Sequence, residues 1–236
     1  HGWDKPMKQG FFEAALELVE ASRAHETYRD AECINLIASE GLKSPAVREI
    51  LRLCQDLECR YAEGENDLDG HVKLRYYQGQ RYITKIENCS ADLMKDLFGC
   101  NWVDMRLVSG THANLATFSG LSAATKNKKM VVAPLSCGAH ISHDYTGLAG
   151  KVMGLETIDH AYDVEEMNID PDKSAAVIRK TKPGIVTFGG SLFLFPHPVK
   201  ELREAAREVE AYVVYDAAHV LGLIAGGQFQ DPLREG

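Results

Sequence analysis

The feature that most constrains the fold is an alternation of short apolar runs with helix-length segments over the second half of the chain. Runs that predict strands lie at 130–133, 151–155, 184–187 and 212–215. Segments that predict helices lie at 112–125, 171–181 and 199–210. Strands joined by crossover helices form parallel or mixed sheets that are covered on both faces. The sequence therefore predicts an α/β fold with a mixed, mostly parallel sheet.

Local signals mark several helix ends. Asp170 and Pro171 supply an N-cap and a first-turn proline, and Ser44 and Pro45 do the same for a helix through about residue 53. A helix over 81–98 is expected to end at Gly99. Its apolar stripe, which should face inward, consists of Ile83, Ile86, Leu93 and Leu97.

The N-terminal region predicts a helical arm. Residues 10–26 have helical periodicity, with Phe11, Leu18 and Val19 on one face. Residues 61–79 show little periodicity and predict a long ordered loop. We therefore expect an arm over 1–60 and one α/β domain over 61–236.

Composition excludes several classes of protein. The formal net charge is -8, from 26 Lys plus Arg against 34 Asp plus Glu, so no nucleic-acid partner is expected. No apolar stretch reaches the length of a membrane span, so no membrane partner is expected. The six cysteines include no C-x-x-C pair, which favours a reduced, cytoplasmic protein.

A first candidate constellation is the segment 109–114, S-G-T-H-A-N, between an extended stretch and a helix. Small and hydroxylated residues at Ser109, Gly110 and Thr111 let backbone N–H groups and a hydroxyl face an anion, and the helix dipole adds to the attraction. A plain helix N-cap is the alternative interpretation of the same residues.

A second constellation is 212–219, Y-V-V-Y-D-A-A-H, in which Asp216 ends a buried strand. A carboxylate there needs a cationic or donating partner, and a protonated pyridine nitrogen is one. A cap of the following turn is an alternative. A metal site built from His140, His143, Asp144, Asp216 and His219 is another, although H-x-x-H is looser than the usual helical ligand spacing.

The third constellation combines 61–64, Y-A-E-G, with 75–79, R-Y-Y-Q-G. The carboxylate of Glu63 and the hydroxyls of Tyr61 and Tyr77 could serve proton transfer near a substrate amine. Surface hydrogen bonding is the alternative interpretation.

Taken together and in order, five segments resemble the serine hydroxymethyltransferase family over nearly the whole chain. Residues 34–40, I-N-L-I-A-S-E, resemble its N-L-I-A-S-E-N segment, and the third constellation resembles its Y-A-E-G…R-Y-Y loop. Residues 109–114 are similar to S-G-S-x-A-N. Residues 138–143 follow G-G-H-L-T-H, and 216–219 follow D-M-A-H.

The resemblance implies a fold-type I large domain that binds pyridoxal 5'-phosphate. Ser109, Gly110 and Thr111 would hold the phosphate. His140 would stack on the pyridine ring and Asp216 would pair with its nitrogen, while Ser191 and His219 would reach the phenolic oxygen. This predicts a transferase or aldolase that makes or breaks the Cα–Cβ bond of a β-hydroxy amino acid in one-carbon metabolism.

The resemblance also implies substrate-binding residues and partners. Ser39, Tyr61, Glu63 and Tyr77 would lie at the amino-acid substrate, with Glu63 transferring a proton, and in that family such loops complete the site across a dimer interface. Tetrahydrofolate is a further cofactor of the family, but the longer, more acidic loop 65–74 weakens that implication here.

One departure concerns the Schiff-base lysine. No lysine follows Lys200, and the family's C-terminal domain is absent from this sequence. We expect a second polypeptide that supplies the lysine, as in a split enzyme, or a homo-oligomer. A truncated piece of a longer enzyme, a lysine-less regulatory or structural subunit and, more remotely, a metal-dependent hydrolase are the alternatives.

Overall fold

The computed structural model describes residues 10–36, 41, 43–53 and 64–236. The chain forms two compact units, one ending at Val47 and the other beginning at Arg48. The boundary predicted at residue 60 lies outside the described residues. In the described part of the chain, no helix is both long and apolar enough to cross a membrane.

The first unit contains helix α1, Phe11–Thr27, which continues into a π-helical turn at Tyr28–Glu32. This confirms the helix predicted over 10–26. Helix α2, Pro45–Leu53, begins at the predicted residue because the backbone N–H of Val47 donates to Ser44 Oγ at 3.3 Å. The apolar side chains on the predicted face of α1 are exposed, for example Phe11 at 80% and Leu18 at 69%.

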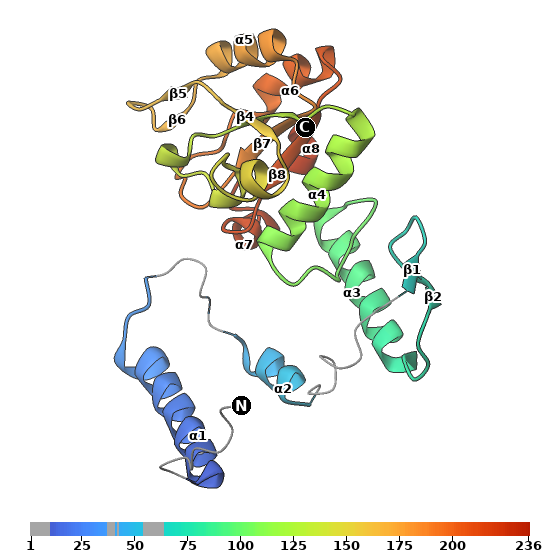
Figure 1. The fold of residues 1–236 in the computed structure, drawn as a ribbon, viewed down its shortest axis with the longest axis vertical. Coiled ribbons are helices and arrows are strands. Elements are labelled where there is room, and N and C mark those ends of the chain that lie inside the picture. Colours follow the sequence, from blue (N-terminus) through green and yellow to red (C-terminus); the bar gives the residue numbers. More distant parts are fainter. Residues whose placement is uncertain (1–9, 37–40, 42, 54–63) are drawn as a thin grey trace, which may run out of the picture. The chain divides into compact units, whose positions relative to one another are not determined.

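The second unit is built on a four-stranded sheet in the order β4-β3-β7-β8. Figure 1 labels β4, β7 and β8 of this sheet. The strands of the sheet are β3 (Lys129–Val132), β4 (Glu156–Asp159), β7 (Ile185–Gly189) and β8 (Tyr212–Asp216). Every pairing in this sheet is parallel. Antiparallel pairing is found in two separate ribbons, β1 with β2 and β5 (Tyr162–Asp163) with β6 (Asn168–Ile169).

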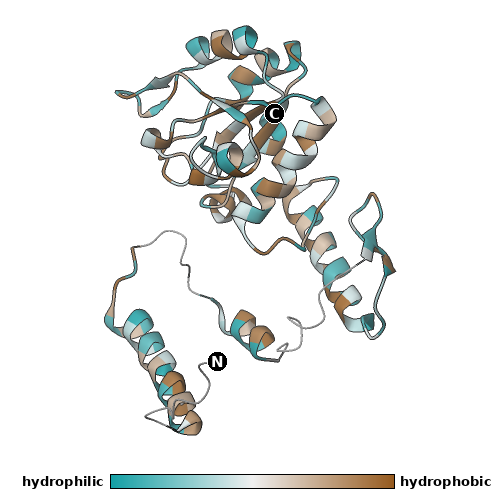
Figure 2. Cartoon of the chain, viewed as in Figure 1, coloured by the Kyte–Doolittle hydropathy of each residue, from teal (hydrophilic) through white to brown (hydrophobic). Residues whose placement is uncertain are grey.

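Helices cover both faces of this sheet, as predicted. Alternate strand residues point to opposite faces, so Val131, Val186 and Phe188 pack with Ile178 of α5 and Leu202 of α6. The strand residues between them, which include Met130, Val132 and Ile185, pack with Phe118 of α4. These helices are α4 (Gly110–Thr125), α5 (Pro171–Thr181) and α6 (Val199–Glu208). Figure 2 shows the apolar residues gathered in the strands between them.

Two short helices follow β8, namely α7 (Leu221–Ala225) and α8 (Pro232–Glu235). Helix α3 (Arg81–Phe98) precedes the sheet and ends at Gly99, whose φ of 60° is the left-handed conformation expected of a glycine cap. The backbone N–H of Gly99 donates to the carbonyl of Lys95, which confirms the predicted helix end.

The prediction that the apolar stripe of α3 faces inward is wrong. Ile83 is half-buried, but Ile86, Leu93 and Leu97 are 43%, 63% and 56% exposed, and among the described residues of this helix only Ala91 is buried. Periodicity identified the helix correctly, but not the orientation of its stripe. Whether an apolar stripe is buried depends on which other segments pack against it. Among the described residues, none covers these three side chains enough to bury them.

The strand predicted at 151–155 is also wrong. Residues Leu148–Val152 form a π-helical turn, and the strand β4 lies just beyond, at Glu156–Asp159. This strand lies at an edge of the sheet with both end residues exposed, so its sequence, E-T-I-D, lacks a marked apolar run. Gly150 allows the turn, because a Cβ there would collide with the backbone of Tyr145.

The predicted loop over 61–79 contains a hairpin within its described part. Strands β1 (Gly64–Asn66) and β2 (Val72–Arg75) pair antiparallel. Asp67 Oδ1 accepts the backbone N–H groups of Asp69 and His71, both at 2.9 Å, which closes the turn between the strands. These strands are too short to produce a clear period of two, so the sequence pattern does not indicate them.

Candidate active site

A pocket of about 160 Å³ lies where the loops after β7 and β8 meet the start of α4. Its position fits the rule that ligands of open α/β sheets bind beyond the carboxyl ends of the strands. The residues that line it are Ser109, Gly110, Thr111, His140, Gly190, Ser191, Asp216, Ala218 and His219. All seven predicted cofactor-binding residues are among these nine.

The start of α4 forms one wall. Ser109 is the N-cap, and its Oγ accepts the backbone N–H of His112 at 3.2 Å. Helix α4 has 16 residues, so its aligned peptide dipoles and free first-turn N–H groups favour an anion at this end. Gly110 keeps the wall open beside Ala218, whose Cβ would lie 3.8 Å from a Cβ at this glycine.

The loops after β3 and β7 are held together by glycine backbone. The carbonyl of Gly138 accepts the N–H groups of Ser191 and Leu192, both at 2.9 Å. Gly138 has a φ of 100°, and a Cβ there would overlap the carbonyl of Leu192. Only glycine therefore lets these loops approach closely enough to place His140 and Ser191 on the same pocket.

Asp216, at the end of β8, is held by three donors. Its Oδ2 lies 2.9 Å from His143 Nε2 and 3.0 Å from Asn114 Nδ2, and its Oδ1 accepts the N–H of Ala218 at 3.1 Å. Burial by itself raises the pKa of this carboxyl, but the hydrogen bonds from His143 and Asn114 outweigh burial and lower the pKa to about 2. Asp216 is therefore a fixed negative charge on the pocket.

His140 approaches the pocket from the loop after β3. Its Nδ1 lies 2.7 Å from Ser142 Oγ and accepts the backbone N–H of Ser142 at 3.2 Å. Burial, with His143 nearby, lowers the pKa of His140, which favours a neutral ring. A neutral aromatic ring on a pocket wall is suited to stacking on a flat ligand.

His219 lies on the turn after Asp216. Its Nδ1 is buried and has no hydrogen-bond partner among the described residues. Buried polar atoms normally have a partner. A polar group on a molecule bound in this pocket would supply one.

Comparison with known proteins decides the family. Residues 13–236 match the family described as serine hydroxymethyltransferase. The chain belongs to the serine hydroxymethyltransferase family. Because the large domain of this family belongs to fold type I, the α/β architecture and the parallel sheet are those of a pyridoxal-phosphate enzyme.

Three relatives illustrate the similarity. Serine hydroxymethyltransferase from Thermococcus onnurineus is 49% identical over 230 residues, which are 98% of this chain and 51% of the relative. The enzyme from Pyrococcus horikoshii is 50% identical over 90% of this chain and 47% of the relative. The enzyme from Methanobrevibacter smithii is 48% identical over 94% of this chain and 50% of the relative. The chain thus spans about half the length of the curated relatives it matches.

Of the substrate-binding residues predicted from the serine hydroxymethyltransferase motifs, Tyr77 lies within the described part of the chain. It follows β2, is 60% exposed and is not among the residues that line the pocket. Ser39, Tyr61 and Glu63 lie outside the described residues. The substrate-binding roles of all four stay predictions.

Two residues that contact Asp216 are not assigned to the cofactor site by sequence reasoning. Asn114 is merely the last letter of S-G-T-H-A-N, yet its side chain is 6% exposed and touches Asp216. The sequence indicates His143 only as a metal ligand, and it is fully buried against Asp216. Their positions along the chain could have indicated both residues. Asn114 is a polar residue at the end of the motif 109–114, and His143 is a polar residue at the end of the motif 138–143.

In the part of the chain that the structure covers, no three His, Cys, Asp or Glu side chains are placed to hold a metal ion together. His143 instead contacts Asp216 directly, and His140 contacts Ser142. The metal-site interpretation of these histidines therefore has no geometric support among the described residues.

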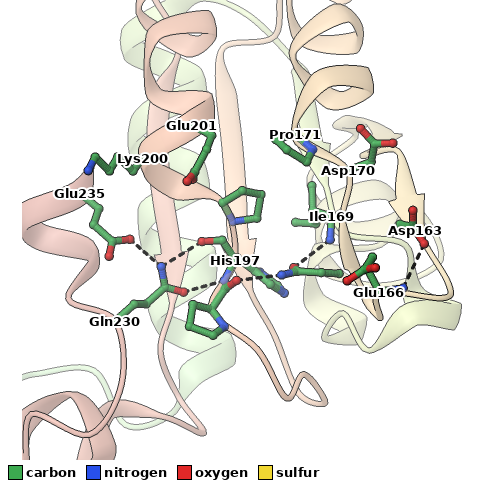
Figure 3. A pocket seen from close by; sticks show the side chains of 13 residues that line it. Asp163, Glu166, Ile169, Asp170, Pro171, His197, Lys200, Glu201, Gln230 and Glu235 are labelled. Atoms are coloured by element: carbon green, nitrogen blue, oxygen red, sulfur yellow. Dashed lines mark hydrogen bonds between the residues drawn. The ribbon is translucent and has the colours of Figure 1, made fainter.

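A larger groove of about 570 Å³ has His197 and Gln230 among its lining residues (Figure 3). Gln230 Oε1 accepts the N–H of His197 at 2.7 Å and the hydroxyl of Tyr215 at 3.0 Å. His197 Nδ1 accepts the N–H of Gly189 at 2.9 Å, and burial lowers the pKa of this histidine to about 4. These bonds tie together the ends of β7 and β8, which carry Gly190 and Asp216 into the pocket.

Proposed function

We propose that these residues form the cofactor site of a pyridoxal-phosphate enzyme that makes or breaks the Cα–Cβ bond of a β-hydroxy amino acid. The transfer would be of the glycine and serine type, as the family description implies. The observation that carries the proposal is the convergence of all seven predicted cofactor-binding residues on one pocket around an ionised Asp216.

The chemistry of the pocket fits pyridoxal phosphate. The start of α4, with Ser109, Gly110 and Thr111, would hold the phosphate through backbone N–H groups and hydroxyls. Asp216 would keep the pyridine nitrogen protonated. The Nδ1 of His219, which has no partner among the described residues, would meet a ring oxygen together with Ser191. The bound cofactor supplies a sink for the electron pair left on the Cα when the bond breaks.

The substrate side of the proposal rests on motifs. Ser39, Tyr61 and Tyr77 would bind the amino acid, and Glu63 would move the proton of the β-hydroxyl as the bond breaks. Tetrahydrofolate as the carrier of the one-carbon group belongs to the same proposal, since the family uses it. The need for a second polypeptide or a second copy of the chain stays a prediction. Mass spectrometry of the purified protein, with any chain that co-purifies, tests it.

The proposal is tested with the protein as purified, together with any chain that accompanies it. Pyridoxal phosphate is titrated while its visible absorbance is recorded, and aldehyde release from a β-hydroxy amino acid is measured. We expect saturable binding in the wild-type protein, and turnover when a chain that supplies the lysine is present. Asp216→Asn should weaken binding about 10- to 100-fold, since a hydrogen bond to a charged group is lost, and should largely abolish turnover.

Two results would contradict the proposal. Turnover that survives Asp216→Asn but is lost on addition of EDTA would favour the metal-dependent hydrolase. Saturable binding with no turnover on any β-hydroxy amino acid, even with a lysine-bearing chain present, would favour a cofactor-binding regulatory subunit.

A further inference from the structure

The side chain of Asn114 lies between Asp216 and Ser142, on a chain of contacts that leads from Asp216 to His140. Its Nδ2 is 3.0 Å from Asp216 Oδ2 and 2.8 Å from Ser142 Oγ. Asn114 and Ser142 are only 6% and 2% exposed, so solvent does not compete for these bonds. Ser142 in turn contacts His140, which completes a path from Asp216 to His140.

The hydrogens on this path can be assigned from donor and acceptor chemistry. An amide nitrogen carries two hydrogens and accepts none, and an ionised carboxylate only accepts. Asn114 therefore donates one hydrogen to Asp216. Its Nδ2 also lies 3.2 Å from His143 Nε2, but that nitrogen carries the hydrogen that it donates to Asp216 at 2.9 Å, so it cannot accept. The second hydrogen of Asn114 goes to Ser142 Oγ.

The same reasoning determines the form of His140. Because Ser142 Oγ accepts from Asn114, its own hydrogen is available for His140 Nδ1 at 2.7 Å. The backbone N–H of Ser142 also points to this Nδ1, at 3.2 Å. A ring nitrogen that receives two donors carries no hydrogen, so the hydrogen of a neutral His140 ring lies on Nε2.

We propose that Asn114 is a positioning residue that couples Asp216 to His140 through Ser142, and so holds Asp216 ionised and His140 as the neutral Nε2–H tautomer. The ionisable groups around this path are His143, His219, His140 and Asp216 itself. The consequence for binding rests on the proposed function: a neutral His140 adds no positive charge beside a protonated pyridine ring.

The wild-type protein without added cofactor provides the first test. The tautomer of His140 is read from the ¹⁵N chemical shifts of its ring nitrogens at neutral pH, with assignment by His140→Asn. We expect an unprotonated Nδ1 and a protonated Nε2. A hydrogen on Nδ1 would overturn the proposal, and this measurement needs no variant of Asn114.

Variants then test the role of Asn114. In Asn114→Ala the pKa of Asp216, followed by ¹³C NMR of its carboxyl, should rise by about one pH unit, and the affinity for pyridoxal phosphate should fall about tenfold. Asn114→Asp keeps the size of the side chain but brings a like charge, so the pKa of Asp216 should rise at least as much. The matched control is Asn127→Ala, which removes side-chain bonds to the carbonyl of Lys182 and the N–H of Lys129, neither of which lies on the pocket.

The outcomes separate the two proposals. An unchanged pKa of Asp216 in a folded Asn114 variant would overturn the coupling. If the pKa of Asp216 rose equally in Asn127→Ala, general destabilisation would explain the shift and the coupling would also fail. If the tautomer and pKa results are as expected but no pyridoxal phosphate binds, the coupling stands and the proposed function fails.

Discussion

His143 Nε2 lies 2.9 Å from Asp216 Oδ2, and the two side chains are only 1% and 9% exposed. One residue comes from the loop after β3 and the other from the end of β8, with β7 between those strands in the sheet. Burial alone would favour a neutral carboxyl at Asp216. The donors His143 and Asn114 reverse that preference, so Asp216 is ionised at the end of β8, beside the pocket.

Asp216 should make the protein's stability fall in acid. Its pKa is about 2 in the folded protein against an ordinary value of 3.8, so its contribution is present above about pH 4 and is lost as the pH falls towards 2. The difference in unfolding free energy between wild type and Asp216→Asn should shrink by about 2 kcal/mol over that range. Urea unfolding at about pH 5 and about pH 2.5 measures it. Asp172→Asn, at an exposed carboxylate, should show no such change.

Ser109 should matter for both stability and ligand binding. Ser109→Ala removes the N-cap of α4. Asp170→Ala removes the N-cap of α5, because Asp170 Oδ1 accepts the N–H of Lys173 at 3.0 Å. Each change should cost about 1 kcal/mol of stability by thermal unfolding. Only Ser109→Ala should also weaken binding of pyridoxal phosphate, because only Ser109 lies on the pocket. Equal affinities in the two variants would contradict a phosphate site at α4.

Gly138 should tolerate no side chain. Gly138→Ala places a Cβ against the carbonyl of Leu192 at a φ of 100°, so we expect a loss of about 2 kcal/mol or more and weaker cofactor binding. Gly120→Ala is the control, because a Cβ there, inside α4, meets nothing within 4 Å. It should stabilise the protein by about 0.5–1 kcal/mol. Chemical denaturation of both variants compares them.

His160 should make stability depend on pH in a higher range. This histidine is 2% exposed, its Nε2 lies 3.2 Å from the carbonyl of Thr187, and burial lowers its pKa to about 3. Between about pH 6.5 and 3 the unfolded chain binds a proton that the folded protein does not, so the unfolding free energy falls as the pH falls. The loss is on the order of 4 kcal/mol.

The variant His160→Gln tests this dependence, since glutamine does not titrate and can still donate to the carbonyl of Thr187. Its unfolding free energy should fall less steeply between about pH 6.5 and 3 than that of the wild type. His112→Gln, at an exposed histidine, serves as control. Parallel curves for the wild type and His160→Gln would show that His160 is not the titrating group.

What the sequence determined lies within a few residues along the chain. The caps at Ser44, Asp170 and Gly99 are confirmed because the groups they satisfy are three or four residues away. The strands β3, β7 and β8 could be predicted for a similar reason, since each is a run of mostly apolar residues. The expectation that all of them are buried is wrong for β8, which lies at the end of the strand order and is only partly buried. Six of the seven predicted cofactor-binding residues could be named because they stand in three of the five motif segments, 109–114, 138–143 and 216–219. Ser191 stands outside these segments and is named from the family resemblance alone.

Only the tertiary structure decided which distant residues meet. Asn114 and His143 reach Asp216 from 102 and 73 positions away in the sequence. The edge strand β4 and the exposed stripe of α3 also escaped local reasoning. The physical reason is common to all of them: burial and polar partners depend on what other segments bring to a site, and periodicity reports only the preference of one segment.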